Sequence, residues 1–286
     1  MIDLHYHLLY GVDDGPADLE TALSMARESA AEGVTEIVCT PHASNLYPYD
    51  AALVEARLAE LRLHLAGVVE LGLGCDFHLS AENIADALAH PLRYSINQGG
   101  YLLVEFPDLL ILPSYEESIY RLQVAGYTPI ITHPERCPAL VRNPALLAAW
   151  IRKGCLVQIT AGSLYGRFGP RAERFSNQML KQHWVHFVAS DAHHPQWRPP
   201  HLKRAYEHVA KRMGTECARR LFSENPRTAA RGERLGKQPA PLGIEAGKTR
   251  RSPARGQMWE KPLPPSLVQR LRHIFTTASA LGAQEE

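Results

Sequence analysis

The sequence predicts an α/β fold in which seven parallel strands alternate with helices and close into a TIM-like barrel, followed by a C-terminal tail. Seven short apolar runs alternate with amphipathic stretches along the first 231 of the 286 residues, which is the pattern of successive βα units. Nearly every run ends in a histidine or a carboxylate residue. The carboxyl ends of barrel strands converge on one rim, whereas an open sheet brings together only the loops near its switch point. The number of polar strand ends therefore favours the barrel.

The predicted strands are short and rich in apolar or β-branched residues. They cover residues 2–5, 36–40, 68–77, 101–105, 129–132, 156–159 and 185–189. Helical spacing of apolar residues predicts helices over residues 19–31, 51–65, 115–125, 144–152 and about 170–182. Glycines follow four of these helices, where a left-handed C-terminal cap suits them, at Gly33, Gly67, Gly126 and Gly154.

The composition excludes several classes of protein. The 31 Lys and Arg residues nearly balance the 30 Asp and Glu residues, whereas a nucleic-acid binder needs a basic excess on its binding face. No run approaches the ~20 apolar residues of a membrane span, and the polar start of the chain does not form a signal peptide. Five cysteines are scattered without CxxC pairs, which indicates reduced thiols. We therefore expect a cytoplasmic protein that does not bind nucleic acid and is not integral to a membrane.

We expect the chain to divide into a domain over residues 1–231, a flexible linker over residues 232–265 and a short amphipathic helix over residues 266–286. The last two parts carry nine Lys or Arg and five Glu residues, a charge of +4 against −3 for residues 1–231. Six prolines lie in the linker, a composition that buries too little apolar surface to offset its ordering entropy. The apolar face of the final helix could dock on this protein or on a second copy. Because Arg270 and Arg272 flank it, recruitment of a partner or an anionic membrane is the alternative.

Histidines and carboxylates at the strand ends are candidate metal ligands. His5 and His7 are two residues apart on one strand, so their side chains leave the same face and can bind one ion. Asp191 and His193 repeat this spacing far along the chain. Each residue has a structural alternative when it is considered singly: histidines cap strands, and Asp14 can bond its own backbone in a turn. Together, imidazole and carboxylate donors without thiolates suit Mn, Fe or Zn in a multinuclear site.

Six motifs extend this pattern over residues 1–200. They are Ile-Asp-Leu-His-Tyr-His at 2–7, Gly-Val-Asp-Asp-Gly at 11–15, Thr-Pro-His at 40–42, Val-Glu-Phe at 104–106, His-Pro-Glu-Arg at 133–136 and Ser-Asp-Ala-His at 190–193. In these motifs the chain resembles the PHP (polymerase and histidinol phosphatase) superfamily and, within it, the bacterial CpsB/YwqE-type protein-tyrosine phosphatases of capsule and exopolysaccharide gene clusters. The resemblance implies a distorted seven-stranded α/β barrel that holds three divalent metal ions.

The resemblance also implies which residues hold the ions. By matched position, the first ion is held by His5, His7 and Asp191, the second by Glu105 and His133, and the third by Asp14, His42 and His193. Manganese is the expected metal, with iron, zinc and magnesium as alternatives.

One position departs from the family pattern. The carboxylate that bridges the first two ions belongs to a Glu in the family, whereas this chain has Asp76. Because Asp is one methylene shorter, the bridge must be drawn in or partly lost. His78 could act as a replacement ligand or contact the substrate, or it could pack or face solvent. Glu82 is a weaker candidate because it lies in the following loop.

Arg136 and Arg198 match the phosphate-binding arginines of the family. A guanidinium fork binds two phosphate oxygens at once, although either arginine could instead form an ordinary salt bridge. We expect Glu135 to orient a ligand or the Arg136 fork. His42 or His193 could protonate the leaving phenolate, and the choice between them stays open.

The residues favour metal-assisted hydrolysis over a covalent cysteine route. Cysteine phosphatases need an Arg six positions after the nucleophile, and none of the five cysteines has one. A GxxxxGK[ST] phosphate loop is also missing from the sequence. Adjacent metal ions lower the pKa of a bound water, and the resulting hydroxide attacks phosphorus in line.

We therefore expect a metal-dependent protein-tyrosine phosphatase. Its expected partner is a phosphotyrosine protein, the tyrosine-rich tail of a bacterial tyrosine kinase that drives polysaccharide export. A PHP small-molecule phosphoesterase of the histidinol-phosphatase kind is one alternative, with the same metals and a different pocket. A metal-binding scaffold weakened at Asp76 is another. The oligomeric state stays open, and a homo-oligomer is among the alternatives.

Overall fold

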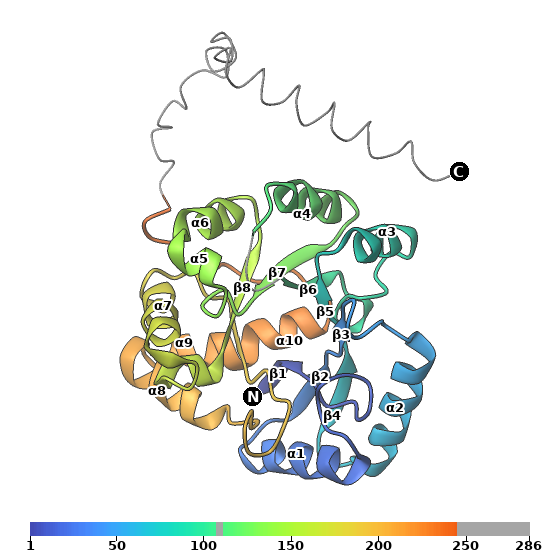
Figure 1. The fold of residues 1–286 in the computed structure, drawn as a ribbon. Helices are drawn as coiled ribbons and strands as arrows, with labels where there is room; N and C mark the ends of the chain where they lie inside the picture. The colour runs from blue at the N-terminus through green and yellow to red at the C-terminus, as the bar shows by residue number, and fades with distance from the viewer. Residues whose placement is uncertain (107–110, 245–286) are drawn as a thin grey trace, which may run out of the picture. The chain divides into compact units, whose positions relative to one another are not determined.

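Parallel strands alternate with helices along the described chain, which comprises residues 1–106 and 111–244 of the computed structural model (Figure 1). The strands of this part are β1 (Ile2–Tyr6), β2 (Glu36–Cys39), β3 (His42–Ala43), β4 (Glu70–Leu73), β5 (Asp76–His78), β6 (Tyr101–Glu105), β7 (Thr128–Thr132), β8 (Leu156–Thr160) and β9 (Phe187–Ala189). They form a three-stranded sheet in the order β1-β2-β4 and a six-stranded sheet in the order β3-β5-β6-β7-β8-β9. Every strand pair is parallel. The predicted α/β class with parallel strands is confirmed.

The described residues form nine strands rather than seven because a short extra strand, β3, follows the second predicted run and the third run is divided between two strands. Beyond β2 the chain turns through Thr40 and Pro41 before β3, and the run over residues 68–77 contains both β4 and the start of β5. The backbone N–H of Gly74 donates to the Cys39 carbonyl at 2.8 Å, and that of Asp76 donates to the Pro41 carbonyl at 3.0 Å. These bonds join residues 39–41 to residues 74–76, so the two segments stay paired where the chain passes from one sheet to the other.

The first and last strands also meet. Tyr6 and Ala192 form an isolated parallel bridge just beyond β9. The His7 N–H donates to the Ala192 carbonyl at 2.9 Å, and the Asp191 N–H donates to the His5 carbonyl at 2.9 Å. Residues more than 180 positions apart in the sequence are therefore adjacent where the strands end.

Helices surround the strands (Figure 1). They are α1 (Leu19–Ala31), α2 (Ala51–His64), α3 (Ala81–Ala89), α4 (Ser114–Val124), α5 (Pro138–Arg142), α6 (Pro144–Arg152), α7 (Gly169–Lys181), α8 (Lys203–Met213), α9 (Thr215–Arg219) and α10 (Asn225–Ala230), with the short turns η1 (Ile96–Gln98), η2 (Ala161–Tyr165) and η3 (Arg220–Glu224). The side chains of Asp18, Asp50 and Ser80 accept hydrogen bonds from backbone N–H groups in the first turns of α1, α2 and α3, which stabilises these helix starts. The four glycines predicted to follow helices all have positive φ angles.

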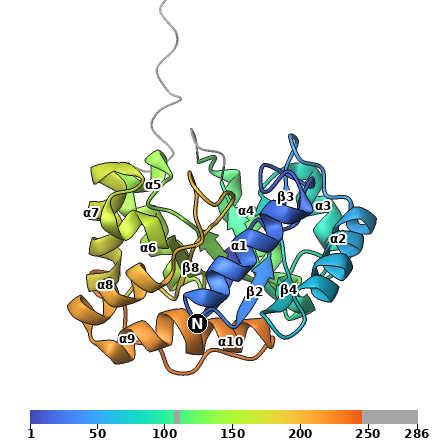
Figure 2. The ribbon, with the colours of Figure 1, turned by 90° about the horizontal axis from the view of Figure 1, so that it is seen from below.

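Two apolar clusters hold the elements together. The larger one packs the outer strand faces against the helices. The smaller inner cluster consists of Ile2, Leu4, Val38, Ile96, Tyr101, Leu103, Ile130, Phe187, Ala229 and Ala230. It combines strands of both sheets with α10, which lies on the side of the molecule where the chain begins (Figure 2). This inner cluster forms the apolar floor beneath the polar strand ends.

An irregularity in β1 changes which side chains face inward. Asp3 pairs with Ile37 and Tyr6 pairs with Cys39, so three steps along β1 correspond to two along β2. An extra residue of this kind switches the inward-facing set from one alternation to the other. Leu4 can therefore belong to the inner cluster while His5, the next residue, faces the polar site above it.

The compact unit that contains these elements spans Met1–Ile244. Residues 232–244, the first part of the predicted flexible linker, therefore pack on the domain instead of leaving it. The Tyr101 hydroxyl donates to the Glu233 carbonyl at 2.7 Å, the Trp184 indole N–H donates to the Leu242 carbonyl at 2.8 Å, and Ile244 is buried. Proline-rich composition alone did not reveal these contacts. The rest of the linker and the predicted helix over residues 266–286 lie outside the described residues.

None of the helices in the described part of the chain combines the length and apolar character needed to cross a bilayer.

Candidate metal centre

The structure brings all nine predicted metal ligands together above the inner cluster. The groups whose donor atoms lie within 4.8 Å of one another are His7–Asp14–His42–His193, His5–His7–Asp76, His5–His133–Asp191, Asp76–Glu105–His133 and His42–His78–Glu105. These residues come from the ends of strands in both sheets and from the loops after β1, β7 and β9. Because the strands are parallel, their carboxyl ends lie on one side, and their polar residues meet there.

The donors matched to the first ion have the spacing of a shared coordination sphere. His5 Nε2 lies 3.2 Å from His7 Nε2 and 3.4 Å from Asp191 Oδ1. His7 Nε2 lies 3.7 Å from the same oxygen. Ligand atoms that each lie ~2.1 Å from one cation are about 3–3.5 Å from each other. The three donors therefore fit one divalent ion.

The other two predicted sets are similarly close. Asp14 Oδ1 lies 3.4 Å from both His42 Nε2 and His193 Nε2. His133 Nε2 lies 3.5 Å from Glu105 Oε1.

Asp76 reaches the middle of the centre despite its short side chain. Its Oδ2 atom lies 3.4 Å from His5 Nε2 and 3.3 Å from His42 Nδ1. It also belongs to a group with Glu105 and His133. The position predicted to bridge two ions is thus adjacent to members of each set.

Three of the histidines are oriented by a hydrogen bond from the ring nitrogen that faces away from the centre. His5 Nδ1 donates to Gln158 Oε1 at 3.1 Å, His7 Nδ1 donates to Asp13 Oδ2 at 2.7 Å, and His193 Nδ1 donates to a backbone carbonyl at 3.0 Å. Such bonds fix the tautomer and leave the Nε2 lone pair for a cation.

Several donor atoms at the centre are buried without a hydrogen bond. Among the described residues, no hydrogen-bond partner exists for Asp14 Oδ1, His42 Nδ1, Asp76 Oδ1, Asp76 Oδ2, Asp191 Oδ1 or His193 Nε2. Buried carboxylate oxygens without partners cost several kcal/mol unless a cation neutralises them. The donor chemistry and these unsatisfied atoms both fit divalent metal ions.

The charges at the centre shift the pKa values of its residues strongly. Burial alone would lower the pKa of His5, but Asp76 and Asp191 raise it to about 9. Burial, together with the neighbouring histidines, holds the pKa of His7 well below its usual range. Burial opposes ionisation of Asp191, yet Arg198, His5 and the other nearby cations keep its pKa well below the usual range. The carboxylate is therefore ionised at neutral pH, and protons compete with cations for the imidazole nitrogens.

Two candidate ligands have strained backbones. His133 has a φ angle of 30° and Asp191 one of 54°, both in the left-handed region that residues with a Cβ rarely adopt. Each costs on the order of 1–3 kcal/mol, and such strain is concentrated at functional sites. His133 directly follows β7 and Asp191 lies two residues beyond the end of β9, and the turns there aim their side chains at the centre.

Both predicted phosphate-binding arginines reach the edge of the centre. Arg136 Nη1 and Arg198 Nη2 donate to the same atom, Asp191 Oδ2. The Arg136 guanidinium also lies over the Phe168 ring, 4.5 Å from its centroid. Arg198 Nε has no hydrogen-bond partner in the described part of the chain, so a buried N–H remains available to a ligand.

The family model for capsular polysaccharide synthesis, CpsB/CapC, matches residues 1–231. The chain belongs to the CpsB/CapC family. It is 35% identical over 243 residues to the tyrosine-protein phosphatase YwqE of Bacillus subtilis, covering 84% of this chain and 95% of YwqE. It is 38% identical over 211 residues to the putative tyrosine-protein phosphatase CapC of Staphylococcus aureus, covering 72% of this chain and 82% of CapC.

A solved structure extends the similarity to the fold. It comes from work on YwqE of Bacillus subtilis and CpsB of Streptococcus pneumoniae, described as unique metal-dependent tyrosine phosphatases. The match has a TM-score of 0.78 and 34% sequence identity, and it covers 85% of this chain and 99% of the other. The sequence resemblance to this family is thereby confirmed.

Three more residues of this CpsB/CapC chain were predicted to assist the metal centre, and the structure places each of them differently. Glu135 does not orient Arg136: its Oε1 atom accepts from the Thr160 N–H and from the Ser163 hydroxyl, both at 2.8 Å. It thus joins the loop after β7 to the end of β8. His78 pairs with Glu105 and belongs to a donor group. Glu82 is exposed in the first turn of α3 and belongs to none of the donor groups of the described chain.

Sequence reasoning missed Asp13 and Gln158, the residues that orient His7 and His5. Asp13 is next to Asp14 in the same turn, and nothing in the sequence shows which carboxylate points inward. Gln158 had a detectable signal, because a fully buried amide in the middle of an apolar strand needs a partner.

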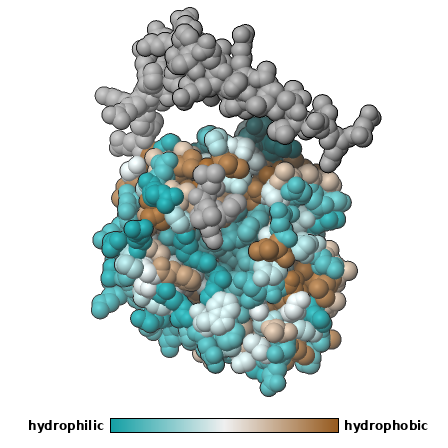
Figure 3. All heavy atoms as spheres, in the orientation of Figure 1, coloured by the Kyte–Doolittle hydropathy of each residue, from teal (hydrophilic) through white to brown (hydrophobic). Residues whose placement is uncertain are grey.

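Aromatic side chains line the rim of the centre. Tyr47 stacks on His42 with ring centroids 5.8 Å apart, and Trp197 lies 6.2 Å from His193 with 52% of its surface exposed. The face drawn in Figure 3 is hydrophilic over most of its area, with separate hydrophobic patches. An exposed Trp beside a polar centre offers apolar contact to the group that carries a bound phosphate.

Proposed function

We propose that this chain is a metal-dependent protein-tyrosine phosphatase. The observation that carries the proposal is the convergence of nine His and carboxylate donors with two arginines in a member of the CpsB/CapC family. Relatives at 35% and 38% identity are named tyrosine-protein phosphatases, one of them putatively. The donor set also suits phosphate-ester hydrolysis, which depends on positioning and on charge neutralisation.

The residues of the centre would bind three separate ions. His5, His7 and Asp191 would hold one ion, Glu105 and His133 a second, and Asp14, His42 and His193 a third, with Asp76 between the first two. Divalent ions held there would activate the attacking water and neutralise phosphate charge. In this proposal the centre holds three ions, and the metal is manganese.

Arg136 and Arg198 would bind the phosphate oxygens. Both guanidiniums are half-buried and adjacent at Asp191, so they converge on one point from two loops. Their donors are already desolvated and oriented, which strengthens binding to the charge that develops during transfer. The phenyl ring of the substrate would rest between Tyr47 and Trp197, and its phenolate is a good leaving group.

The substrate proposed is a phosphotyrosine protein, namely a bacterial tyrosine kinase that regulates capsule or exopolysaccharide synthesis. The family description, capsular polysaccharide synthesis, supports that role. The cysteine pattern supports a cytoplasmic location. A homo-oligomer remains part of the proposal to be tested by mass measurement in solution.

We also infer that the two sheets together form a seven-stranded, distorted barrel. If β2 with β3 and β4 with β5 are counted as single interrupted strands, the strands number seven. The Tyr6–Ala192 bridge then closes the set into a distorted barrel. Residues 1–231 would form the catalytic domain.

A paired assay tests the function. Purified protein is stripped with a chelator, reloaded with Mn²⁺, and given a phosphotyrosine peptide and histidinol phosphate. We expect hydrolysis of the peptide, its loss in chelator, its return with Mn²⁺, and a preference over histidinol phosphate. Activity that persists in chelator would refute the proposal.

The Asp76→Glu variant separates a weakened enzyme from a scaffold. A large gain in activity would indicate that the shorter carboxylate limits an active enzyme. Inactivity of both forms with full metal loading, measured by elemental analysis, would favour the scaffold.

A further inference from the structure

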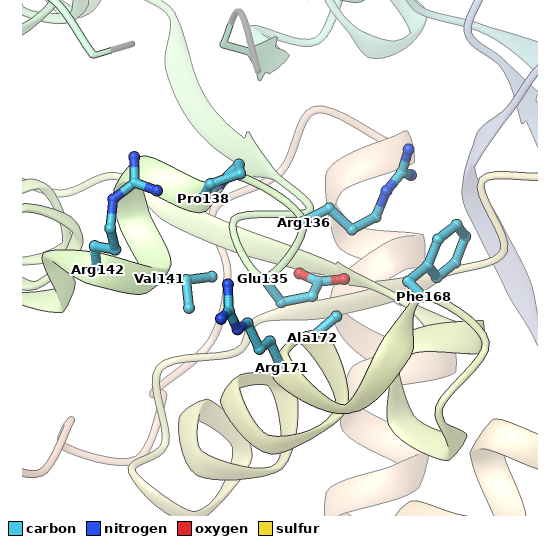
Figure 4. Close-up of a pocket in the computed structure, with 8 residues that line it drawn as sticks. All are labelled: Glu135, Arg136, Pro138, Val141, Arg142, Phe168, Arg171 and Ala172. Carbon is cyan, nitrogen blue, oxygen red and sulfur yellow. The ribbon is translucent and has the colours of Figure 1, made fainter. Parts of the chain in front are cut away.

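A cavity of about 620 Å³ lies beside the metal centre, between α5 and the start of α7 (Figure 4). Its lining includes Arg136, whose guanidinium also touches Asp191. The cavity therefore shares Arg136 with the place where the phosphate would bind. Its volume lies within the range of ~300–1,000 Å³ typical of ligand sites.

The cavity wall combines apolar surface with positive charge. Pro138, Val141 and Phe168 provide the apolar part, and Arg136, Arg142 and Arg171 the cations. Figure 4 shows Arg142 and Arg171 on the side of the cavity away from Phe168, and Arg136 close to that ring. The cavity therefore has cations at both of its ends.

The single carboxylate among the described lining residues does not balance these cations. Glu135 is buried, and its Oε1 atom is bonded to Thr160 and Ser163. Even when Glu135 is ionised, three arginines on the lining face one carboxylate. The cavity keeps a net positive charge.

Arg142 and Arg171 are unpaired in the described part of the chain. Both are exposed, and neither has a hydrogen-bond, ion-pair or ring partner there. By contrast, Arg136 and Arg198 share a carboxylate. Two free guanidiniums on one cavity wall repel each other unless an anion lies between them, and the guanidinium fork matches carboxylate and phosphate oxygens.

We propose that this cavity is a subsite for an anionic side chain of the substrate protein, a carboxylate or a second phosphate ester close in sequence to the phosphotyrosine. The inference rests on the proposed function and adds a specificity element to it. Arg142 and Arg171 bind the anion, while Pro138 and Val141 contact the adjoining peptide. Neither arginine touches the metal centre, so they select the protein substrate without taking part in the chemistry.

The test compares three substrates on the Mn²⁺-loaded full chain. The first is a phosphotyrosine peptide series with Glu placed at each of the five positions on either side, and with Ala at the same position as its neutral control. The second replaces that Glu by a second phosphotyrosine. The third is p-nitrophenyl phosphate, which is too small to reach the cavity while its phosphate lies at the metal centre. The Arg142→Ala/Arg171→Ala variant is compared with the unchanged protein and with Arg174→Ala. Arg174 is exposed on the same helix but lines a different cavity.

We expect the double variant to raise KM for the best anionic peptide about fivefold, the effect of two surface ion pairs. Its KM for an alanine-substituted peptide and its rate on p-nitrophenyl phosphate should stay within twofold, as should every value for Arg174→Ala. A larger effect on the Glu peptide would identify a carboxylate ligand, and a larger effect on the doubly phosphorylated peptide would identify a phosphate.

Equal changes for anionic and alanine peptides, or no change for either, would overturn the subsite. Failure of the proposed function would look different, because the unchanged Mn²⁺-loaded protein would then hydrolyse none of the three substrates. In that case binding of the fluorescent anionic peptide, measured by anisotropy, decides the matter. Weaker binding by the double variant supports the subsite, and equal binding refutes it.

Discussion

Replacing Asp13 with Asn should weaken Mn²⁺ binding about 30-fold. The Asp13 carboxylate accepts three hydrogen bonds, from His7 Nδ1 at 2.7 Å, from the His42 N–H at 3.0 Å and from the Gly15 N–H at 2.9 Å. The first two end on one oxygen and the third on the other. An Asn side chain has one accepting oxygen and an NH₂ group that donates, so at least one of these donors must lose its partner.

The magnitude follows from the bond that is lost. A hydrogen bond to a charged group contributes about 1.5–3 kcal/mol, and about 2 kcal/mol corresponds to a 30-fold change in affinity. This agrees with the 10- to 100-fold effects typical of residues that orient metal ligands. The loss falls on metal binding because His7 Nδ1 then bonds at best to a neutral amide oxygen instead of a carboxylate, so its Nε2 is less basic and less firmly oriented towards the centre.

Calorimetric titration of the metal-free protein with Mn²⁺ measures the effect. The control is Asp18→Asn, because Asp18 caps α1 by accepting from Thr21 and Asn caps a helix equally well. A melting curve shows whether each variant is folded. If folded Asp13→Asn binds Mn²⁺ within twofold of the unchanged protein, Asp13 does not orient His7 for the metal.

Three further predictions concern the phosphate site, acid stability and metal removal. Arg198→Lys should lower kcat/KM for aryl phosphates at least tenfold while Mn²⁺ affinity stays within threefold, since Lys has no fork; steady-state kinetics and calorimetry check both. Burial lowers the pKa of His186 to about 4 from 6.5, so its neutral form contributes stability that is complete above pH 6.5 and is lost as the pH falls through 4. The stability lost amounts to about 3 kcal/mol. Between pH 7 and pH 4, the free energy of unfolding measured in urea should therefore fall by about 3 kcal/mol more in the unchanged protein than in His186→Leu; an equal fall in both proteins contradicts this. Chelation should lower the melting temperature, and Mn²⁺ at about 100 times its Kd should restore about 2.7 kcal/mol; unchanged melting curves would show that the centre binds no metal.

The strand ends could be predicted from the sequence because their polar residues follow apolar runs. His42, Glu105 and His133 each come at or just after such a run, and parallel strands place their carboxyl ends together. The short strand β3 after the second run and the break between β4 and β5 in the third run could not be predicted. They depend on backbone pairing across the sheets at Gly74 and Asp76 rather than on hydropathy.

Side-chain direction was harder to predict than position. Because of the extra residue in β1, His5 faces the centre although the preceding residue, Leu4, faces the inner cluster. Regular alternation along a strand does not predict two consecutive inward-facing residues. Glu135 was expected to orient a ligand or Arg136 at the centre, but its carboxylate instead accepts a hydrogen bond from the Thr160 N–H. Such choices depend on which buried donor needs a partner, and that is settled only by tertiary packing.

Two of the donors that are adjacent in space come from the first strand of the compact unit and from just beyond its last strand. His5 stands near the start of the chain and Asp191 lies 186 residues further on, yet their side chains are 3.4 Å apart. During synthesis, the ribosome must therefore release the chain through Asp191 before His5 and Asp191 can bind the same cation. Tight uptake of manganese would then report that a molecule has been finished and folded through β9, and a fragment that stops short of that strand would remain unable to load.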